Sequence, residues 1–309
     1  MKKLCFTILL LIVAVFSMAK DKSSYEKGIN YFNEKDFTKA KIELENSLIE
    51  NPNLTFANIF LGLIYCDNGD YGRALANFVS FTAKPADEAY LPKAYQLIVL
   101  CYSKQSKWQT ALDKALEFSN LTTDQDFKRT LGTAYLNVAS KTDINLRNPS
   151  KYVEYCQKSV ELFEDYYKNF PNDVWIKNDI GRAYLLLYSA KDEKDLTILN
   201  RATKYLESEK EPYFILNLSV AERFYGDFYK MEAWRFLPEN GSKTADTNFQ
   251  ACNKFIDAKK KYEKAIELID SLIENKSNIP ALETKRKLYV YEVNLLKNDN
   301  TIKKLKCFK

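Results

Sequence analysis

The residue types available for chemistry are restricted, because the 309-residue sequence contains no histidine. Histidine is the usual proton shuttle near neutral pH, the base that activates serine and cysteine nucleophiles, and the commonest transition-metal ligand. The 8 glycines are scattered, so no glycine-rich loop is present to cradle a phosphate group. These absences argue against nucleotide chemistry and against most hydrolytic and metal-dependent mechanisms.

Carboxylates are the remaining candidates for acid–base chemistry. Glu161, Glu164 and Asp165 have helical spacing and could act as paired acids in glycoside hydrolysis, but a solvated helix face explains the same pattern. The segment Asp67-Asn68-Gly69-Asp70 resembles a calcium-binding loop without the acidic residue needed at its twelfth position. We therefore predict no catalytic residues, no metal ligands and no cofactor, and the chain is not expected to be an enzyme.

The 6 cysteines show no C-x-x-C spacing for metal or redox chemistry. Cys5 lies in an apolar N-terminal run, and without it an odd number remains, which cannot be fully paired within one chain. Cys66, Cys101, Cys156 and Cys252 fall in apolar helical patterns, where cysteine behaves as a small hydrophobic residue. We expect these four to be buried thiols, and Cys307, in a polar tail, to be the reactive one.

The N-terminus has the pattern of a secretory signal peptide. Lys2 and Lys3 precede an apolar run from Leu4 to Phe16, and Ser17-Met18-Ala19 supplies small residues for cleavage. The run is shorter than the ~20 residues that span a bilayer, so cleavage after Ala19 is favoured over an uncleaved anchor. We predict export to the periplasm or cell envelope of a bacterium.

The charged residues are mixed in sign, with 46 Lys and Arg against 41 Asp and Glu. This balance is that of an ordinary solvated surface and does not indicate a nucleic-acid partner. Lys259, Lys260, Lys261 and Lys264 form a basic patch that could contact anionic lipid. A solvated helix face accounts for it better, so membrane association is not predicted.

An internal repeat organises the first two thirds of the chain. Gly28, Tyr31, Phe37, Ala40 and Leu44 recur 34 residues later as Gly62, Tyr65, Tyr71, Ala74 and Phe78. Later copies are looser, and their recurring positions are Tyr102 and Ala111, then Gly132 and Tyr135, then Gly181 and Tyr184. The pattern resembles the tetratricopeptide repeat (TPR) family, in particular exported bacterial proteins with such repeats. This resemblance implies an all-α, right-handed solenoid of helix-turn-helix repeats.

The C-terminal third resembles the family only in pieces. A sixth repeat begins at Pro212 and is expected to turn at Gly226-Asp227-Phe228. One long amphipathic helix, or two in line, is expected to follow it, and a capping helix is expected from Pro280. The lysine-rich end is expected to be disordered. The predicted organisation is a signal peptide at 1–19, TPR-like repeats at 21–209, a divergent helical region at 210–297 and a basic tail at 298–309.

The resemblance implies a binding groove that is lined by the first helices of the repeats. The predicted groove residues are Tyr25, Ile29, Phe32, Ile59, Leu63, Arg129 and Arg182. We infer a protein or peptide partner with an apolar anchor near Phe32 and Ile59 and an acidic stretch reaching the two arginines. An equal alternative is that the chain's own N-terminal segment covers the apolar positions.

The favoured interpretation is therefore a protein–protein interaction scaffold of the cell envelope. One alternative is an envelope hydrolase that uses carboxylates between Pro212 and Asn300, with the repeats as support. Another is a structural spacer that oligomerises through its end helices. We make no prediction of the oligomeric state.

Overall fold

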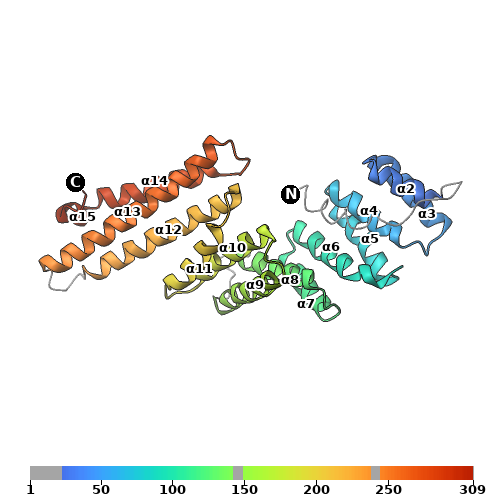
Figure 1. The fold of residues 1–309 in the computed structure, drawn as a ribbon, viewed down its shortest axis with the longest axis horizontal. Helices are drawn as coiled ribbons and strands as arrows, with labels where there is room; N and C mark the ends of the chain where they lie inside the picture. Colours follow the sequence, from blue (N-terminus) through green and yellow to red (C-terminus); the bar gives the residue numbers. More distant parts are fainter. Residues whose placement is uncertain (1–22, 142–148, 238–243, 309) are drawn as a thin grey trace. The chain divides into compact units, whose positions relative to one another are not determined.

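The computed structural model describes residues 23–141, 149–237 and 244–308. Every regular element in these ranges is a helix, which confirms the predicted all-α solenoid class. The chain divides into two compact units, Met1–Leu146 and Arg147–Lys309, and within each unit consecutive helices lie side by side (Figure 1). The predicted border at residues 209 and 210 marks where the family resemblance weakens, and it stays a prediction.

Three helix pairs and one further helix form the described part of the first unit. They are α2 (Ser24–Asn33), α3 (Phe37–Glu50), α4 (Phe56–Asp67), α5 (Tyr71–Ala83), α6 (Leu91–Lys104), α7 (Trp108–Ser119) and α8 (Gln125–Lys141). Asp36 and Asp70 accept hydrogen bonds from the backbone N–H groups of Lys39 and Arg73 at the starts of α3 and α5. Such caps satisfy donors that have no partner within the helix, so each second helix begins at a fixed residue.

The turn between the two helices of a pair has the same form in three successive pairs. Lys35, Gly69 and Ser106 occupy equivalent positions, and all have a left-handed backbone, with φ values of 63°, 77° and 60°. At each turn the residue that follows the left-handed position donates its backbone N–H to the carbonyl oxygen five residues earlier. Asp70, for example, donates to Tyr65 at 2.9 Å. This is the Schellman type of helix ending, which favours glycine. Only the second pair has glycine there.

Replacing Ser106 by glycine is expected to raise the free energy of unfolding by about 0.5–1 kcal/mol. A left-handed conformation costs a non-glycine residue roughly 1–2 kcal/mol, and part of this gain is offset because glycine loses more entropy on folding. Urea denaturation of the full chain measures the change. Gly69→Ala, at the equivalent turn, is the matched control and should lower the stability; a destabilised Ser106→Gly variant would contradict the argument.

Close helix crossings explain the recurring glycines and alanines. A Cβ atom added at Gly28 would stand 2.7 Å from Leu44 Cγ, and one added at Gly62 would overlap the Phe78 ring. Ala40 and Ala74 are fully buried on the opposing helices. The two helices of each pair therefore approach closely at these positions, as ridge-and-groove packing with small residues requires.

Seven helices form the described part of the second unit, and the last of them is short. They are α9 (Pro149–Asn169), α10 (Val174–Ala190), α11 (Leu196–Leu206), α12 (Pro212–Arg235), α13 (Ala245–Glu274), α14 (Leu282–Asn298) and α15 (Asn300–Leu305). The region after Pro212 therefore continues the succession of packed helices, and the expectation of one long amphipathic helix is met by α13.

The predicted turn at Gly226-Asp227-Phe228 is wrong, because these residues lie inside α12. Gly226 faces α13 instead, where a Cβ atom would come within 2.6 Å of the Tyr262 ring. The buried Tyr262 hydroxyl donates a 2.7 Å hydrogen bond to Asp227. Burial and the neighbouring Asp227 carboxylate raise the pKa of Tyr262, so the hydroxyl remains a neutral donor.

The described part of the C-terminal tail, up to Phe308, is ordered, contrary to prediction. Ile302 of α15 is buried in a core cluster with residues from α12, α13 and α14. Cys307 is also buried there and forms a disulfide bond with Cys252 of α13. The expectations of a free Cys252 and a reactive Cys307 are therefore wrong, whereas Cys66, Cys101 and Cys156 are buried thiols as expected.

None of the helices within the described ranges is both long enough and apolar enough to cross a lipid bilayer.

Candidate functional site

A hollow of about 440 Å³ lies between α9, α10 and α11 in the second unit. Its apolar lining consists of Val160, Leu187 and Ile198, each 7–8% exposed. The charged residues around it include both signs, with Lys191 and Arg201 as cations and Glu161, Glu164 and Asp195 as carboxylates. An apolar base surrounded by charged groups can receive an apolar side chain and select its neighbours by charge.

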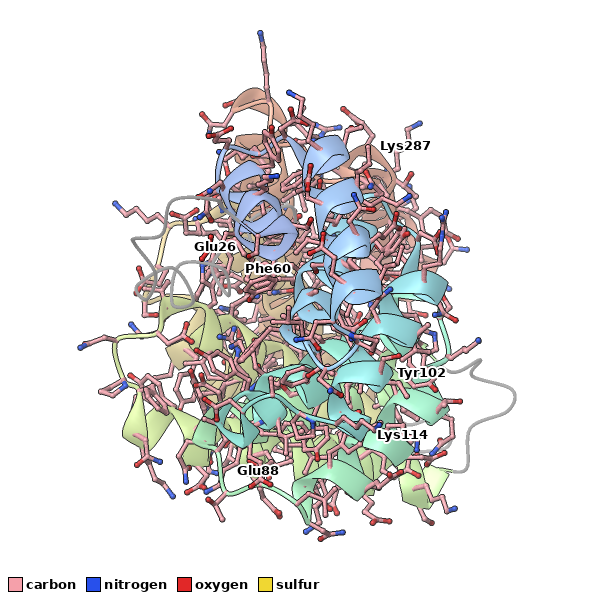
Figure 2. The ribbon with its side chains drawn as sticks, turned by 90° about the vertical axis from the view of Figure 1, so that its right-hand side faces the viewer. Glu26, Phe60, Glu88, Tyr102, Lys114 and Lys287 are labelled. Carbon is pink, nitrogen blue, oxygen red and sulfur yellow. A yellow bond between two sulfur atoms is a disulfide. The ribbon has the colours of Figure 1, made fainter. Side chains whose placement is uncertain are left out.

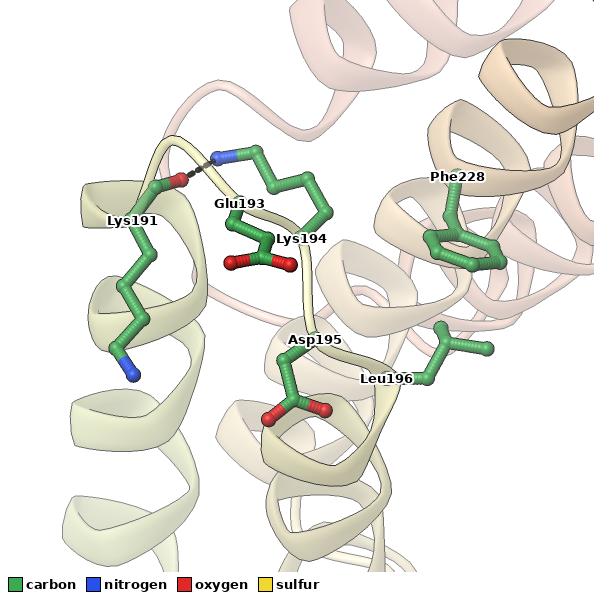
Figure 3. A pocket seen from close by; sticks show the side chains of 6 residues that line it. All are labelled: Lys191, Glu193, Lys194, Asp195, Leu196 and Phe228. Carbon is green, nitrogen blue, oxygen red and sulfur yellow. Dashed lines mark hydrogen bonds between the residues drawn. The ribbon is translucent and has the colours of Figure 1, made fainter. Parts of the chain in front are cut away.

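A second hollow, of about 430 Å³, adjoins the first and shares Lys191 and Asp195 with it. It follows the connection between α10 and α11 and reaches Phe228 of α12 (Figure 3). The Lys194 side chain folds back over the end of α10, where its ammonium group donates to the carbonyl oxygens of Tyr188, Ser189 and Lys191. A cation at this position satisfies carbonyls that the helix leaves unpaired. These hydrogen bonds fix the connection between α10 and α11 beside the hollow.

Glu164, which lines the first hollow, is held in place by two tyrosines. The Tyr184 hydroxyl donates a 2.6 Å hydrogen bond to Glu164, and the Tyr205 hydroxyl donates a 3.4 Å bond to the same oxygen atom. Arg201 donates to the Tyr184 hydroxyl at 3.3 Å. Burial, followed by the Glu164 charge, raises the pKa of Tyr205 to about 12. Both tyrosines are therefore fixed donors that hold Glu164 in place.

The carboxylates considered for catalysis have separate structural partners. Glu161 forms a 3.2 Å ion pair with Lys158 and is largely exposed, whereas Glu164 accepts the tyrosine hydrogen bonds. In an acid–base pair one carboxyl group must be protonated near neutral pH, usually by burial away from hydrogen-bond donors. Glu164 is not in such an environment, because two tyrosine hydroxyls donate hydrogen bonds to it. Across the described ranges no group of three acidic or cysteine side chains is arranged to hold a metal ion.

The hydrogen bond from Tyr184 to Glu164 repeats one in the first unit. Tyr65, near the end of α4, donates a 3.2 Å hydrogen bond to Glu45 of the preceding helix α3. In both units the bonded tyrosine and glutamate are 20 residues apart. In both units a first helix also contacts the next first helix, as α6 contacts α8 and α10 contacts α12. Gly181 of α10 meets Leu206 of α11 as Gly62 meets Phe78. The chain has a TPR-like fold.

Several solved structures are similar to this chain at low sequence identity. No family pattern matches the chain, and no curated protein does. A crystal structure of MamA protein is 20% identical, with a TM-score of 0.45 over 60% of this chain and 90% of that one. A tetratricopeptide repeat protein from Parabacteroides merdae ATCC 43184 is 12% identical, with a TM-score of 0.41 over 87% of this chain and all of that one.

A third similar structure is a monomeric mutant of IFIT1 with Gppp-AAAA. It is 15% identical, with a TM-score of 0.45 over 98% of this chain and 65% of its own. At these identities the likenesses concern the fold alone, and we take no function from them.

The small residues of the repeat pattern lie in the core of the TPR-like units. Their buried members are Gly28, Ala40, Gly62, Ala74, Ala111, Gly132 and Gly181. The aromatic members differ, because Tyr65 and Tyr184 are buried, whereas Tyr31, Tyr102 and Tyr135 are only half-buried. Tyr65 and Tyr184, which donate to Glu45 and Glu164, are thus the more enclosed tyrosines of the pattern.

Three apolar residues of the predicted groove are not open to solvent. Phe32, Ile59 and Leu63 are 3–4% exposed, and Phe32 packs edge-on against Phe60, a core residue of α4 labelled in Figure 2. Every residue from 57 to 66 is buried, so α4 has no exposed face. The expected apolar anchor near Phe32 and Ile59 is thus an interior position; the N-terminal segment considered as its cover lies mostly outside the described residues.

The other groove residues are partly accessible. Tyr25 and Ile29 are half-buried on α2, and burial together with Tyr90 raises the pKa of Tyr25 to about 12. Arg129 of α8 and Arg182 of α10 are half-buried, and Arg182 lies 3.8 Å from Asp179. The two arginines belong to different units, and their binding role stays a prediction.

Lys191, Asp195, Arg201 and Tyr205, which belong to the hollow or border it, were not singled out in the sequence. The connection from Lys191 to Asp195, between α10 and α11, is longer than the three-residue turn between α4 and α5. The spacing of 20 residues that relates Glu45 to Tyr65 and Glu164 to Tyr184 was the available signal.

Proposed function

We propose that this TPR-like chain is a protein-binding scaffold of the bacterial cell envelope, and that the hollow between α9, α10 and α11 receives a segment of its partner. The observation that carries the proposal is the combination of an apolar base with a rim of mixed charge. Energetically dominant contacts between proteins have this composition, with an apolar centre and a polar surround that excludes water.

The rim favours a peptide over a nucleic acid as the occupant. Lys191 and Arg201 would attract a phosphate group, but Glu161 and Asp195 lie on the same rim and would repel it. A peptide with one apolar side chain between an acidic and a basic residue satisfies both signs. The IFIT1 ligand Gppp-AAAA carries several phosphates, and this hollow is not suited to such a chain of charges.

Reversing the two rim cations is expected to weaken partner binding at least tenfold, or ~1.4 kcal/mol. The variant is Lys191→Glu with Arg201→Glu, which leaves an almost wholly acidic rim. A photoactivatable amino acid at Thr197 first identifies the partner in an envelope extract, and calorimetry with the purified partner then compares affinities.

Lys204→Glu is the matched control, because Lys204 is exposed on α11 outside the hollow. It should bind as tightly as the parent. Circular dichroism establishes that all variants keep their helical content. If the folded double variant binds the identified partner with the parent's affinity, the hollow is not the binding site.

Two observations support the proposed location. The pattern of Lys2, Lys3, apolar run and Ser17-Met18-Ala19 is that of an export signal, and the disulfide between Cys252 and Cys307 is a bond typical of oxidising compartments.

The protein isolated from its native cell envelope is therefore expected to begin at Lys20. Intact-protein mass spectrometry measures this directly, since removal of residues 1–19 changes the mass by far more than any other common processing step. A native protein that retains Met1 through Ala19 would contradict cleavage and would favour an uncleaved anchor.

A further inference from the structure

Two cysteines of adjacent repeats lie in contact inside the first unit. Cys66 of α4 and Cys101 of α6 have their Sγ atoms 3.6 Å apart, although 35 residues separate them in sequence. Both side chains are buried, with 5% and 0% of their surface exposed, and neither forms a disulfide in the structure. A disulfide bond requires ~2.0 Å between the sulfur atoms, so a relative movement of about 1.5 Å would join the two first helices.

Both thiols lie where their helices end. Cys66 is the next-to-last residue of α4 and precedes the exposed residues 67–69, and Cys101 is in the last turn of α6. Helix ends open locally at lower free energy than helix centres do. A reagent can therefore reach Cys66 from the turn without unfolding of the unit.

The surroundings favour a reactive thiol at Cys66. Its hydrogen bond with Cys101 and the positive charge of Lys104 lower the pKa of the Cys66 thiol, and burial opposes this effect. The thiolate is the form that attacks a disulfide. Cys66 is accordingly the first of the two to react.

The chain already contains a closed disulfide in its second unit, between Cys252 and Cys307. Conditions that oxidise that pair also act on other accessible thiols of the same chain. Among the five described cysteines, a bond between Cys66 and Cys101 would leave only Cys156, which is fully buried.

We propose that Cys66 and Cys101 form a second, reversible disulfide that links α4 to α6. The oxidant is an external disulfide, such as glutathione disulfide. The Cys66 thiolate attacks one of its sulfur atoms, which forms a mixed disulfide and releases one thiolate. Cys101 loses its proton to water and attacks Cys66 Sγ, which releases the second external thiolate. The two cysteines lose two electrons and two protons, and the external disulfide becomes two thiols.

The bond fixes the spacing between the first helices of two adjacent repeats. In the reduced form no disulfide joins α4 to α6, whereas in the oxidised form a covalent bond holds this spacing. The proposal does not depend on what the hollow of the second unit binds, since it concerns the first unit alone.

The test equilibrates the purified full-length protein with mixtures of reduced and oxidised glutathione. Free thiols are then blocked under denaturing conditions with N-ethylmaleimide, and each cysteine is followed by peptide mass spectrometry. Cys66 and Cys101 should lose at least nine tenths of their label together, with a peptide that links them, whereas Cys156 keeps its label. In the Cys66→Ser variant, Cys101 should remain a labelled thiol.

Two results would overturn the proposal. One is full labelling of Cys66 and Cys101 in mixtures that keep Cys252 and Cys307 joined. The other is a glutathione adduct that stays on Cys66 without closing onto Cys101. A Cys156→Ser variant that closes the Cys66–Cys101 bond as the parent does supports the assignment and shows that Cys156 takes no part.

Discussion

Replacement of Gly62 by leucine is expected to lower the free energy of unfolding by about 2–4 kcal/mol. Gly62 lies where α4 crosses α5, and even a single Cβ atom there would overlap the ring of Phe78. Phe78 is itself fully buried, so it cannot move into solvent to make room. The two helices must separate, and they lose contacts along their shared face. Urea denaturation followed by circular dichroism measures the loss.

Gly72→Ala is the control for this experiment, because it changes another glycine of the same helix pair. Its added Cβ atom would meet only Asp70 Oδ1, at 3.6 Å, which is ordinary contact. Alanine favours a helix over glycine by up to ~1 kcal/mol, so this variant should be at least as stable as the parent. Equal unfolding curves for Gly62→Leu and the parent would place the helix crossing elsewhere.

Replacement of Cys307 by serine is expected to lower the stability of the second unit by about 2–4 kcal/mol under non-reducing conditions. The disulfide spans 55 residues between Cys252 and Cys307, and the loss of a long closed loop increases the entropy of the unfolded chain. The bond also holds α15 on the core cluster of α12, α13 and α14. Without it, Ile302 is kept in place only by packing.

A reducing agent separates the effect of the bond from that of the substitution. The parent should lose stability when tris(2-carboxyethyl)phosphine is added, and the Cys307→Ser variant should change little. Tryptophan fluorescence includes a probe of this unit, because Trp234 lies edge-on to the core residue Phe255. A Trp108→Phe background removes the tryptophan of the first unit. If the reductant affects both proteins equally, the disulfide does not stabilise this core.

The repeated part of the fold was predictable because one local rule is used several times. A small residue at a helix crossing and an aspartate cap at the start of a second helix are short-range features, and they recur at a fixed spacing. Gly28 with Leu44 and Gly62 with Phe78 therefore show the same packing in the structure. Even a copy without the glycine, with Val99 at that position, forms a helix pair, since neighbouring pairs provide the remaining contacts.

The C-terminal region was less predictable because the same sequence signal has a different use there. Gly226-Asp227 resembles the turn at Gly69-Asp70, but Asp227 accepts the Tyr262 hydroxyl from α13. The contact depends on a residue 35 positions away, which no local pattern reveals. In the same way, Cys252 and Cys307 have no informative spacing, and only the tertiary fold brings them together.

The candidate site was missed for a related reason. The groove prediction used family positions and assumed that first helices have one open face, but α4 is apolar all round and buried. The hollow instead lies beside a connection that departs from the family pattern, between Lys191 and Leu196. Its shape depends on Lys194, whose ammonium group donates to three carbonyl oxygens at the end of α10, and no sequence pattern indicates these contacts.

The short sequence separation of three cross-helix hydrogen bonds bears on how the chain is made. Tyr65 donates to Glu45, Tyr184 to Glu164 and Tyr225 to Asn200, and the bonded residues are 20, 20 and 25 positions apart. A ribosome releases the acceptor first in each of these pairs. Each of these three helices thus finds its hydrogen-bonding partner already in place on the helix before it, and these contacts can form in the order of synthesis, without waiting for distant segments.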